Sequence, residues 1–188
     1  MVVARLDAPP DEVRSLQASL CPHERQRAQR FRCEPHRRRF IVARGRLRQL
    51  LAARLDLTPE AVEFAYGANG KPRVLNLHFS VSHCDDVALF AFSRASEIGV
   101  DVEAIRPIRE ADAIAAQFFS PSERLVCEME KPLGFLRCWT RKEALVKGIG
   151  EGLSLPLERF DVAHAPGWRL HSFFPLPGFI AAVASHHG

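Results

Sequence analysis

The first third of the chain has the hydrophobic spacing of helices. A short apolar segment at 1–6 has no signal-peptide pattern and is predicted to be a strand. Helical spacing follows in two short stretches, 9–20 and 22–32, and in a longer one at 35–55. In the longest stretch, apolar residues recur along one side while arginines occupy the other faces, which is the pattern of an amphipathic helix.

Strand-like segments dominate the middle of the chain. Short apolar segments predict strands at 62–66, 77–83, 87–93 and 98–103. The second and third of these are joined by Cys84-Asp85-Asp86, a composition typical of a hairpin turn. Helices are then predicted at 109–118, 120–130 and 132–147. Ser120 and Glu123 have the spacing of a capping box. The last segment is predicted to hold short strands near Phe160, at 168–173 and at 179–184.

These elements run in the order helices, strands, helices, strands. The repeated order favours the α+β class, with two similar α/β halves packed as a pseudo-dimer within one chain. We expect an N-terminal half at 1–96 and a C-terminal half at 97–188. With 188 residues and 47% hydrophobic composition, the chain is long enough to bury a core without disulfide or metal staples.

Composition and charge narrow the class of protein. The chain has no apolar run of membrane-spanning length, and its five cysteines form no C-x-x-C pair, which indicates reduced thiols in a cytoplasmic protein. Ten arginines lie between Arg25 and Arg48, with Glu34 the single carboxylate among them. This density predicts an anionic partner, either a phosphate or an acidic protein surface. For any one arginine, the alternative is an ordinary solvated helix face.

Asp101 and Glu103 are the most informative polar residues. They lie two apart in the strand predicted at 98–103, so both carboxylates share a face while the valines beside them face the core. Two adjacent like charges repel unless a cation lies between them, and oxygen ligands of this kind suit Mg²⁺. The alternative is an exposed strand face paired with Arg106, and the acidic pair taken alone favours that alternative.

Three further residues have phosphate or metal chemistry. Glu143 and Lys147 are four apart in a predicted helix and share a face. They form either an ordinary surface ion pair or a third metal carboxylate with a phosphate-neutralising lysine. His83 ends a predicted strand, where it is either a surface histidine or a phosphate donor. Lys71, in the loop Gly70-Lys71-Pro72, can present a point charge to phosphate.

These segments together resemble a known family. In order they are Gly70-Lys71-Pro72, Phe79 with Ser82-His83, Gly99–Glu103, Phe118–Glu123 and Trp139–Leu157. The ordered set resembles the signature of the 4'-phosphopantetheinyl transferases, in particular the larger monomeric type that activates surfactin synthetase and similar assembly lines. The resemblance covers roughly 25–160, most of the chain.

The resemblance implies a Mg²⁺-dependent transfer of 4'-phosphopantetheine from coenzyme A to a serine of an apo acyl or peptidyl carrier protein, with release of 3',5'-ADP. The carrier would belong to polyketide, nonribosomal-peptide or fatty-acid biosynthesis. Asp101, Glu103 and Glu143 would bind Mg²⁺, with Mn²⁺ as an alternative ion. Lys147 would neutralise the pyrophosphate. Glu123 is a candidate general base, and Glu143 acting through a water is its rival.

The resemblance also implies how the substrates are held. Lys71, Ser82 and His83 would contact the coenzyme A phosphates, and Arg27 and Arg37 would lie near the 3'-phosphate. The N-terminal half would therefore hold the nucleotide and phosphates, and the C-terminal half the metal site and catalytic helix. The carrier protein would dock on 118–136, and a chain holding both halves would act as a monomer.

Three positions depart from the family pattern, and two other functions remain open. Ser80 stands where the family often has Asn, Cys84 where it often has Ser, and Glu24 where relatives can carry a basic residue. The alternatives are an inactive relative that only binds carrier proteins and a basic nucleic-acid-binding protein. The sequence contains no P-loop, dinucleotide fingerprint or recognised nucleic-acid-binding motif, so we expect neither a nucleic-acid partner nor a different phosphoryl transferase.

Overall fold

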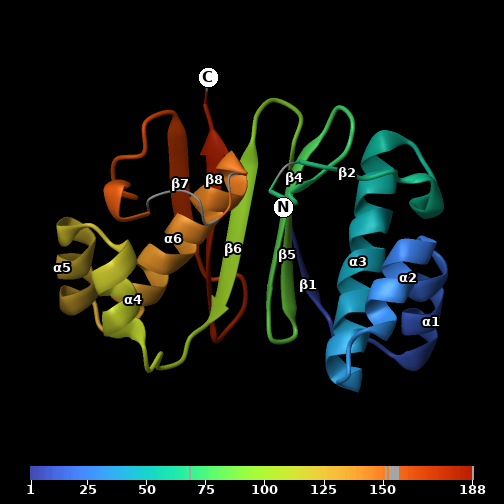
Figure 1. Ribbon diagram of the computed structural model, residues 1–188, viewed down its shortest axis with the longest axis horizontal. Coiled ribbons are helices and arrows are strands. Elements are labelled where there is room, and N and C mark those ends of the chain that lie inside the picture. Colours follow the sequence, from blue (N-terminus) through green and yellow to red (C-terminus); the bar gives the residue numbers. More distant parts are fainter. Residues whose placement is uncertain (68, 151, 153–156, 188) are drawn as a thin grey trace. The chain divides into compact units, whose positions relative to one another are not determined.

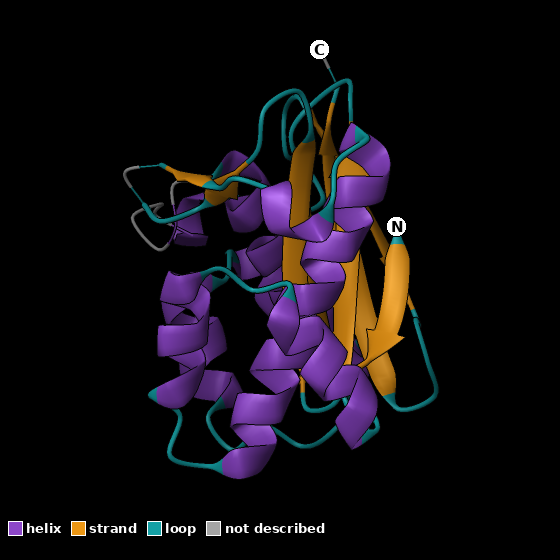
Figure 2. Cartoon of the chain, turned by 90° about the vertical axis from the view of Figure 1, so that its right-hand side faces the viewer, coloured by secondary structure: helices purple, strands orange, loops and turns teal. Residues whose placement is uncertain are grey.

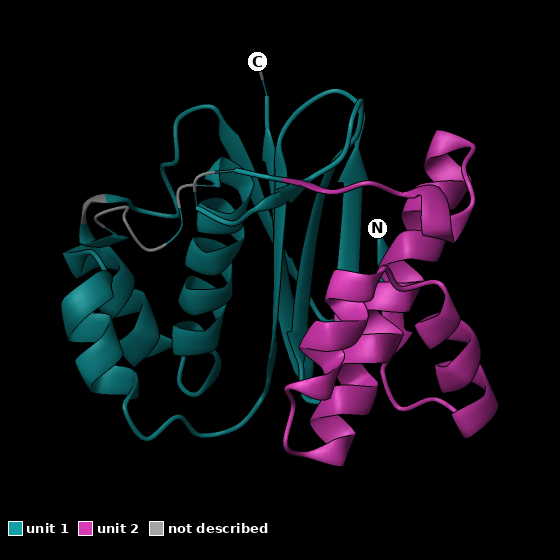
Figure 3. Cartoon of the chain, turned by 45° about the vertical axis from the view of Figure 1, so that its right-hand side comes forward, with its two compact units in different colours: residues 1–3, 66–85, 89–188 teal, residues 4–65, 86–88 magenta. Residues whose placement is uncertain are grey.

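The computed structural model describes residues 1–67, 69–150, 152 and 157–187. Internal packing divides the chain into two compact units, each described here by itself (Figure 3). Unit 1 comprises residues 1–3, 66–85 and 89–188, and unit 2 comprises residues 4–65 and 86–88. The functional halves predicted at 1–96 and 97–188, and their pseudo-dimeric packing, stay predictions.

Unit 2 is helical. Its elements are α1 (Pro10–Ala18), α2 (Pro22–Gln29), α3 (Glu34–Leu55) and the short 3-10 helix η1 (Pro59–Ala61). The three helices predicted from apolar spacing are confirmed, and α3 ends at Asp56, whose φ of 58° is left-handed. Leu16 of α1 and Leu51 of α3 are buried in this unit, so the apolar sides of the helices form its core.

Many arginines of α3 bind groups of unit 2 itself. Arg48 is 2% exposed and donates to Glu24 Oε2 at 2.7 Å, and Arg44 also pairs with Glu24. Arg44 lies with its guanidinium over the Phe64 ring, 3.8 Å from the centroid. Arg48 also donates to the carbonyl of Pro59 at 2.7 Å. Glu24 therefore stands where relatives can be basic because it neutralises the buried Arg48 and the partly buried Arg44.

Other arginines of α3 bind the segment before α1. Arg38 donates to the Ala8 carbonyl at 2.8 Å, and Arg46 donates to the Arg5 carbonyl at 2.8 Å. Arg46 also donates to Glu12, at 2.7 Å. These arginines therefore have structural roles. The predicted anionic partner would be bound by the exposed arginines that remain.

Unit 1 is built from strands with helices against them (Figure 1, Figure 2). One sheet has the order β1-β5-β4, a second has the order β6-β8-β7, and β2 pairs with β3. The strands are β1 (Val2–Arg5), β2 (Ala65–Tyr66), β3 (Pro72–Arg73), β4 (His78–Cys84), β5 (Val87–Ser93), β6 (Ile98–Ala104), β7 (Trp168–Phe173) and β8 (Phe179–His186). β8 lies antiparallel to both β6 and β7.

The helices of unit 1 are α4 (Ala111–Phe118), α5 (Pro121–Met129) and α6 (Leu133–Ile149), with a 3-10 helix η3 (Leu157–Arg159). α6 packs on β6, β8 and β7 (Figure 1). The predicted mixture of helices and strands is confirmed, as is the capping box of Ser120 and Glu123 at the start of α5. No helix in the described part of the chain is long and apolar enough to cross a membrane.

Two strand predictions need correction. The strand predicted at 62–66 is reduced to Ala65–Tyr66. The strand predicted near Phe160 is wrong, because the residues before it form η3. The physical reason is Lys142, whose buried ammonium donates hydrogen bonds to the carbonyls of Leu157 at 2.7 Å and Phe160 at 2.6 Å. Those carbonyls bind a charge instead of a neighbouring strand.

Glycines bring β6 and α6 into backbone contact. A Cβ placed on Gly99 of β6 would lie 1.9 Å from the Ala144 carbonyl oxygen and 2.4 Å from the Gly148 nitrogen. A Cβ placed on Gly148 would lie 2.5 Å from the Trp168 ring. These two positions therefore accept only glycine without a shift of the elements. The close approach sets the polar residues of β6 beside those of α6.

Candidate active site

The face of β6 that carries the two acids packs against β4. Asp101 is 3% exposed and Glu103 is half-buried. Ser82 donates to Asp101 Oδ1 at 2.8 Å, and the Cys84 thiol donates to Glu103 Oε2 at 3.4 Å. The predicted alternative of an exposed acidic face is wrong because Asp101 is buried, and Arg106 forms its ion pair with Asp85.

Two of the three positions that depart from the family pattern, Ser80 and Cys84, lie where β4 contacts β6. Ser80 accepts a hydrogen bond from the Val100 N–H at 3.1 Å, and Cys84 accepts one from the Ala104 N–H at 3.3 Å. Burial raises the pKa of the Cys84 thiol to about 11, so the group stays protonated and continues to donate. Ser80 and Cys84, with Ser82 between them, thus join β4 to β6 through side chains.

Lys147 reaches across from α6 to the same acid. Its ammonium lies 2.6 Å from Asp101 Oδ1 and 3.0 Å from the Ser82 hydroxyl. The structure does not show the alternative of an ordinary surface ion pair between Glu143 and Lys147. Lys147 pairs with Asp101 instead, which joins α6 to β6. Lys147 is therefore placed at the acidic pair, where it can also meet an anionic ligand.

Burial and neighbouring acids raise the pKa of two carboxyls of this site, Glu103 and Glu143. Burial, and then the charge of Asp101, raise the pKa of Glu103 above its ordinary value. Burial also raises the pKa of Glu143, and the charges of Asp101 and Glu103 add to this against the opposing effect of Lys147. Glu103 and Glu143, whose ionisation is disfavoured beside Asp101, form with it a site that a cation stabilises.

One atom of this site lacks a partner within the protein. Asp101 Oδ2 is buried and accepts no hydrogen bond, although an unpaired buried carboxylate oxygen is costly. The residues present fit Mg²⁺, which takes one or two carboxylates and completes its shell with other oxygens. Among the residues that the structure describes, no three His, Cys, Asp or Glu side chains form a closed metal site. Lys147 holds the other oxygen of Asp101.

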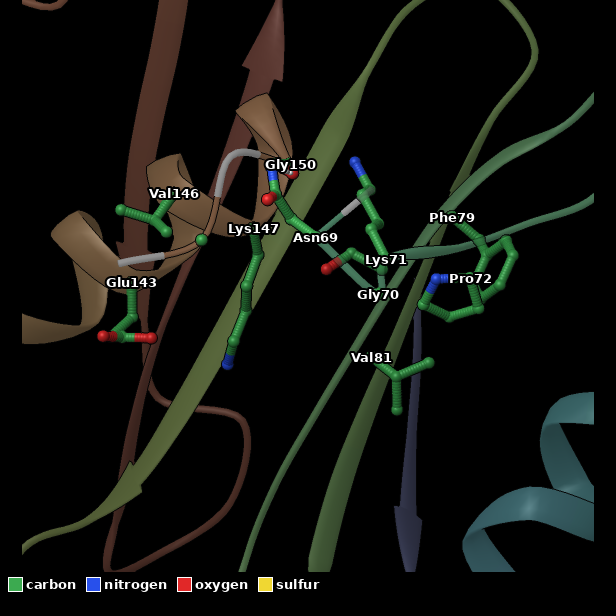
Figure 4. A pocket seen from close by; sticks show the side chains of 12 residues that line it. Asn69, Gly70, Lys71, Pro72, Phe79, Val81, Glu143, Val146, Lys147 and Gly150 are labelled. Carbon is green, nitrogen blue, oxygen red and sulfur yellow. Dashed lines mark hydrogen bonds between the residues drawn. The ribbon is translucent and has the colours of Figure 1, made fainter. Parts of the chain in front are cut away.

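A pocket of about 300 Å³ opens beside this site (Figure 4). It lies between the loop at 69–72, strand β4 and the C-terminal half of α6. Its described lining residues are Asn69, Gly70, Lys71, Pro72, Phe79, Ser80, Val81, Glu143, Val146, Lys147, Gly150 and Gly152. Glu143 and Lys147 project from α6 in the same direction (Figure 4). The pocket thus combines an apolar wall with one acid and two lysines, a lining suited to a phosphorylated organic ligand.

The predicted phosphate-binding residues fall in different places. Lys71 lines the pocket, but its ammonium donates to Glu97 and to the Gly148 carbonyl, each at 2.8 Å. Ser82 is buried beneath Lys147. His83 is exposed at the end of β4, and partial burial of its ring together with the charge of Lys147 lowers its pKa. The imidazole is therefore neutral near pH 7 in the unliganded protein.

Glu123 has structural partners. It is 3% exposed, it caps α5 through the Ser120 N–H at 2.7 Å, and it pairs with Lys142 at 2.9 Å. Its second oxygen accepts from the Val162 N–H at 2.9 Å. Glu123 is not among the described residues that line the pocket, so its predicted role as a base has no support from this arrangement.

Arg27 and Arg37 both belong to unit 2. Arg27 is exposed with its guanidinium over the Phe40 ring, 5.3 Å from the centroid. Arg37 is also exposed and pairs with Glu34 one turn earlier on α3. Both side chains are accessible to an anion, and their predicted contact with the 3'-phosphate stays a prediction.

Comparison with known proteins supports the same family that the motifs indicate. The model of the 4'-phosphopantetheinyl transferase superfamily matches residues 97–186. The 4'-phosphopantetheinyl transferase HetI of Nostoc sp. is 35% identical over 95% of this chain and 84% of its own length. This chain belongs to the 4'-phosphopantetheinyl transferase family. The 4'-phosphopantetheinyl transferase Sfp of Bacillus subtilis is 28% identical over 89% of the chain and 83% of its own length.

Family membership makes the chain a phosphopantetheinyl transferase. Sequence reasoning missed the structural role of two residues near the pocket. Glu97 binds Lys71, and its signal was weak, because a lone acid before a strand has many ordinary roles. Phe79 was noticed as part of a motif, and the structure adds that it lines the pocket.

Proposed function

We propose that this chain transfers 4'-phosphopantetheine from coenzyme A to a serine of an apo acyl or peptidyl carrier protein, releasing 3',5'-ADP. The observation that carries the proposal is the meeting of Asp101, Glu103, Glu143 and Lys147 beside one pocket in a member of this family. An inactive carrier-binding relative would not need this arrangement, because docking alone requires no cluster of carboxylates.

The metal in this proposal is Mg²⁺, with Mn²⁺ as the alternative ion. Asp101 is the firmest ligand, because its Oδ2 atom is buried and unpaired, and Glu103 and Glu143 would complete the protein's share. When bound, Mg²⁺ supplies positive charge to the pyrophosphate oxygens. Lys147 would then neutralise the developing charge of the leaving 3',5'-ADP, for which its position between Asp101 and the pocket is suited.

The transfer step forms one bond and breaks one. The carrier's serine oxygen bonds to the β-phosphorus of coenzyme A, and the bond from this phosphorus to the bridging oxygen breaks, so that 3',5'-ADP leaves. The serine proton must go to a base. We favour Glu143 acting through a water, because it lines the pocket and its pKa is raised by burial and by neighbouring acids. Glu123 is the less favoured candidate because its oxygens already have partners.

Each predicted half of the chain would contribute residues to coenzyme A binding and transfer. Ser82, acting through Lys147, which it contacts, and His83 would meet the coenzyme A phosphates, and Lys71 would contact the same ligand through the pocket wall that it forms. Exposed Arg27 and Arg37 would meet the 3'-phosphate. In this proposal the segment 1–96 supplies nucleotide and phosphate contacts, the segment 97–188 supplies the metal site, and one pseudo-dimeric chain acts as a monomer.

The carrier would dock on an apolar face of α5, within the segment predicted at 118–136. Leu125, Val126 and Met129 are 57%, 36% and 77% exposed. They lie on neighbouring turns of one helix and form an apolar patch on its surface. An apolar helix face is a common way to bind a partner's helix.

The proposal is tested by incubating the protein with a purified apo carrier, coenzyme A and Mg²⁺, and weighing the carrier by mass spectrometry. We expect a gain of one phosphopantetheine that is abolished by a chelator and reduced at least about 100-fold by Asp101→Ala. Carriers from fatty-acid, polyketide and peptide pathways should be tried together. No mass gain with any of them would overturn the proposal, and carrier binding without mass gain would identify an inactive relative.

A further inference from the structure

A cluster of charges includes Lys71 of the loop at 69–72, and its central acid is not one of the residues that the family motifs mark. Its centre is Glu97, the residue immediately before β6. The Glu97 carboxylate accepts from Lys71 at 2.8 Å and lies 3.3 Å from His78 Nδ1 and 3.8 Å from the Arg73 guanidinium. One acid thus faces three basic side chains.

Lys71 connects this acid to the end of α6. Its ammonium donates to the Gly148 carbonyl at 2.8 Å, in the last turn of the helix, where a positive charge also favours the helix dipole. Its stem packs against Gly150, since a Cβ placed there would lie 3.0 Å from Lys71 Cδ. Asn69 of the same loop lies 3.4 Å from the Gly150 carbonyl.

These contacts join two walls of the pocket. The loop at 69–72 forms one wall, and α6, which carries Glu143 and Lys147, forms another. In Figure 4 the Lys71 ammonium points toward Gly150 and away from the Lys147 ammonium. The aliphatic stem of Lys71 therefore lines the pocket, while its ammonium binds Glu97 and the end of α6.

Glu97 is itself fixed to the sheet. Its backbone carbonyl accepts from the His186 N–H at 3.0 Å, at the end of β8. Burial alone would raise the pKa of its carboxyl, but the hydrogen bond and charge of Lys71, with His78 and Arg73, lower it. An ionised carboxylate on a fixed strand end is a rigid anchor for a loop lysine.

We propose that Glu97 is a positioning residue for coenzyme A binding: it holds Lys71 against the end of α6 and so fixes the width of the pocket. This inference rests on the proposed function, which names the ligand. It differs from the family-based expectation for Lys71, in which the ammonium binds a phosphate directly. In the present inference, loss of Glu97 loosens the pocket wall and weakens donor binding without touching the reacting atoms.

The test compares Glu97→Gln with the unchanged protein in the carrier-modification assay. We expect the KM for coenzyme A to rise about tenfold while kcat stays within about twofold, because the lost contact is a half-buried, charge-assisted hydrogen bond away from the chemistry. Glu97→Asp keeps the charge and should restore most of the affinity. Calorimetric titration of coenzyme A into each protein should show the same order of affinity.

Arg73→Gln is the matched control. Arg73 faces the same carboxylate but is 58% exposed at its side chain and is not among the described residues lining the pocket. The KM of the Arg73→Gln protein for coenzyme A should therefore stay unchanged. A Glu97→Gln protein with an unchanged KM would overturn the inference. A lower KM would also overturn it, because it would mean that freed Lys71 binds phosphate. If Glu97→Gln does not fold, Glu97→Asp is compared with Lys71→Met. An equal rise in the KM for coenzyme A in these two variants would also overturn the inference. Failure of the unchanged protein to modify any carrier would instead overturn the proposed function.

Discussion

Glu24 shows how single residues of unit 2 gain their role from neighbouring charges. Burial alone would raise its pKa, but the hydrogen bond from Arg48 and the charge of Arg44 lower it below the ordinary value of 4.5. A carboxyl whose pKa is lower in the folded than in the unfolded state stabilises the fold above the unfolded pKa. That contribution is lost as the pH falls through the folded pKa. Glu24 should therefore make folding sensitive to acid.

We expect Glu24→Gln to lower the free energy of unfolding at pH 7 by about 3–5 kcal/mol, because the buried Arg48 and the partly buried Arg44 lose their counter-ion. The unchanged protein should lose stability as the pH drops below about 4.5, and the variant should depend less on pH there. Urea denaturation over a pH series measures both effects. Glu12→Gln is the control: its carboxylate is 41% exposed and pairs with Arg46, so the cost should stay below about 1 kcal/mol. Equal costs for the two variants would contradict this account.

At the scale of elements, the contact between β6 and α6 decides the geometry of the site. We expect Gly99→Ala to destabilise the protein by about 3 kcal/mol, the upper part of the range for overpacked cores, because its Cβ would strike the backbone of α6. Transfer activity should fall at temperatures where the variant is still folded, because Asp101 and Lys147 are moved apart. Thermal unfolding with the carrier assay measures both.

Gly67→Ala is the matched control for that substitution. A Cβ at Gly67 would meet only the Lys71 carbonyl oxygen, at 3.9 Å, so we expect a stability change within about 1 kcal/mol. If Gly99→Ala were as harmless as Gly67→Ala, backbone contact between β6 and α6 would not set the geometry of the site.

Periodicity alone predicted most elements, because their apolar faces are continuous along the chain. It could not predict how side chains join elements distant in sequence. The Ser82 bond to Asp101 connects β4 to β6, and neither strand's pattern contains it. The strand expected near Phe160 failed for the same reason, because Lys142 arrives from another helix. The acids Asp101 and Glu103 could be singled out because two-residue spacing is local, whereas Glu97 acquires its role through a distant lysine.

At the scale of the whole molecule, recognition of a second protein requires a surface. We expect Met129→Glu to raise the KM for the carrier about tenfold, because it places a charge in the apolar patch on α5, and to leave the KM for coenzyme A unchanged. Leu75→Glu is the control, since Leu75 is 82% exposed and lies outside 118–136. Steady-state assays that vary each substrate separate the two constants. If both variants raised the KM for the carrier equally, the cause would be non-specific repulsion between the added charge and an acidic carrier.

The scarcity of lysine gives the molecule built-in chemical reporters. The chain has just four lysines: Lys71, Lys131, Lys142 and Lys147. Lys131 is exposed, Lys142 is 1% exposed at its side chain, and the other two are held by carboxylates. Brief acylation by an amine reagent, read by peptide mass, would label Lys131 as an internal reference. Labelling of Lys142 would report opening of the core, and protection at Lys71 and Lys147 would report the state of the pocket walls and the acidic site separately.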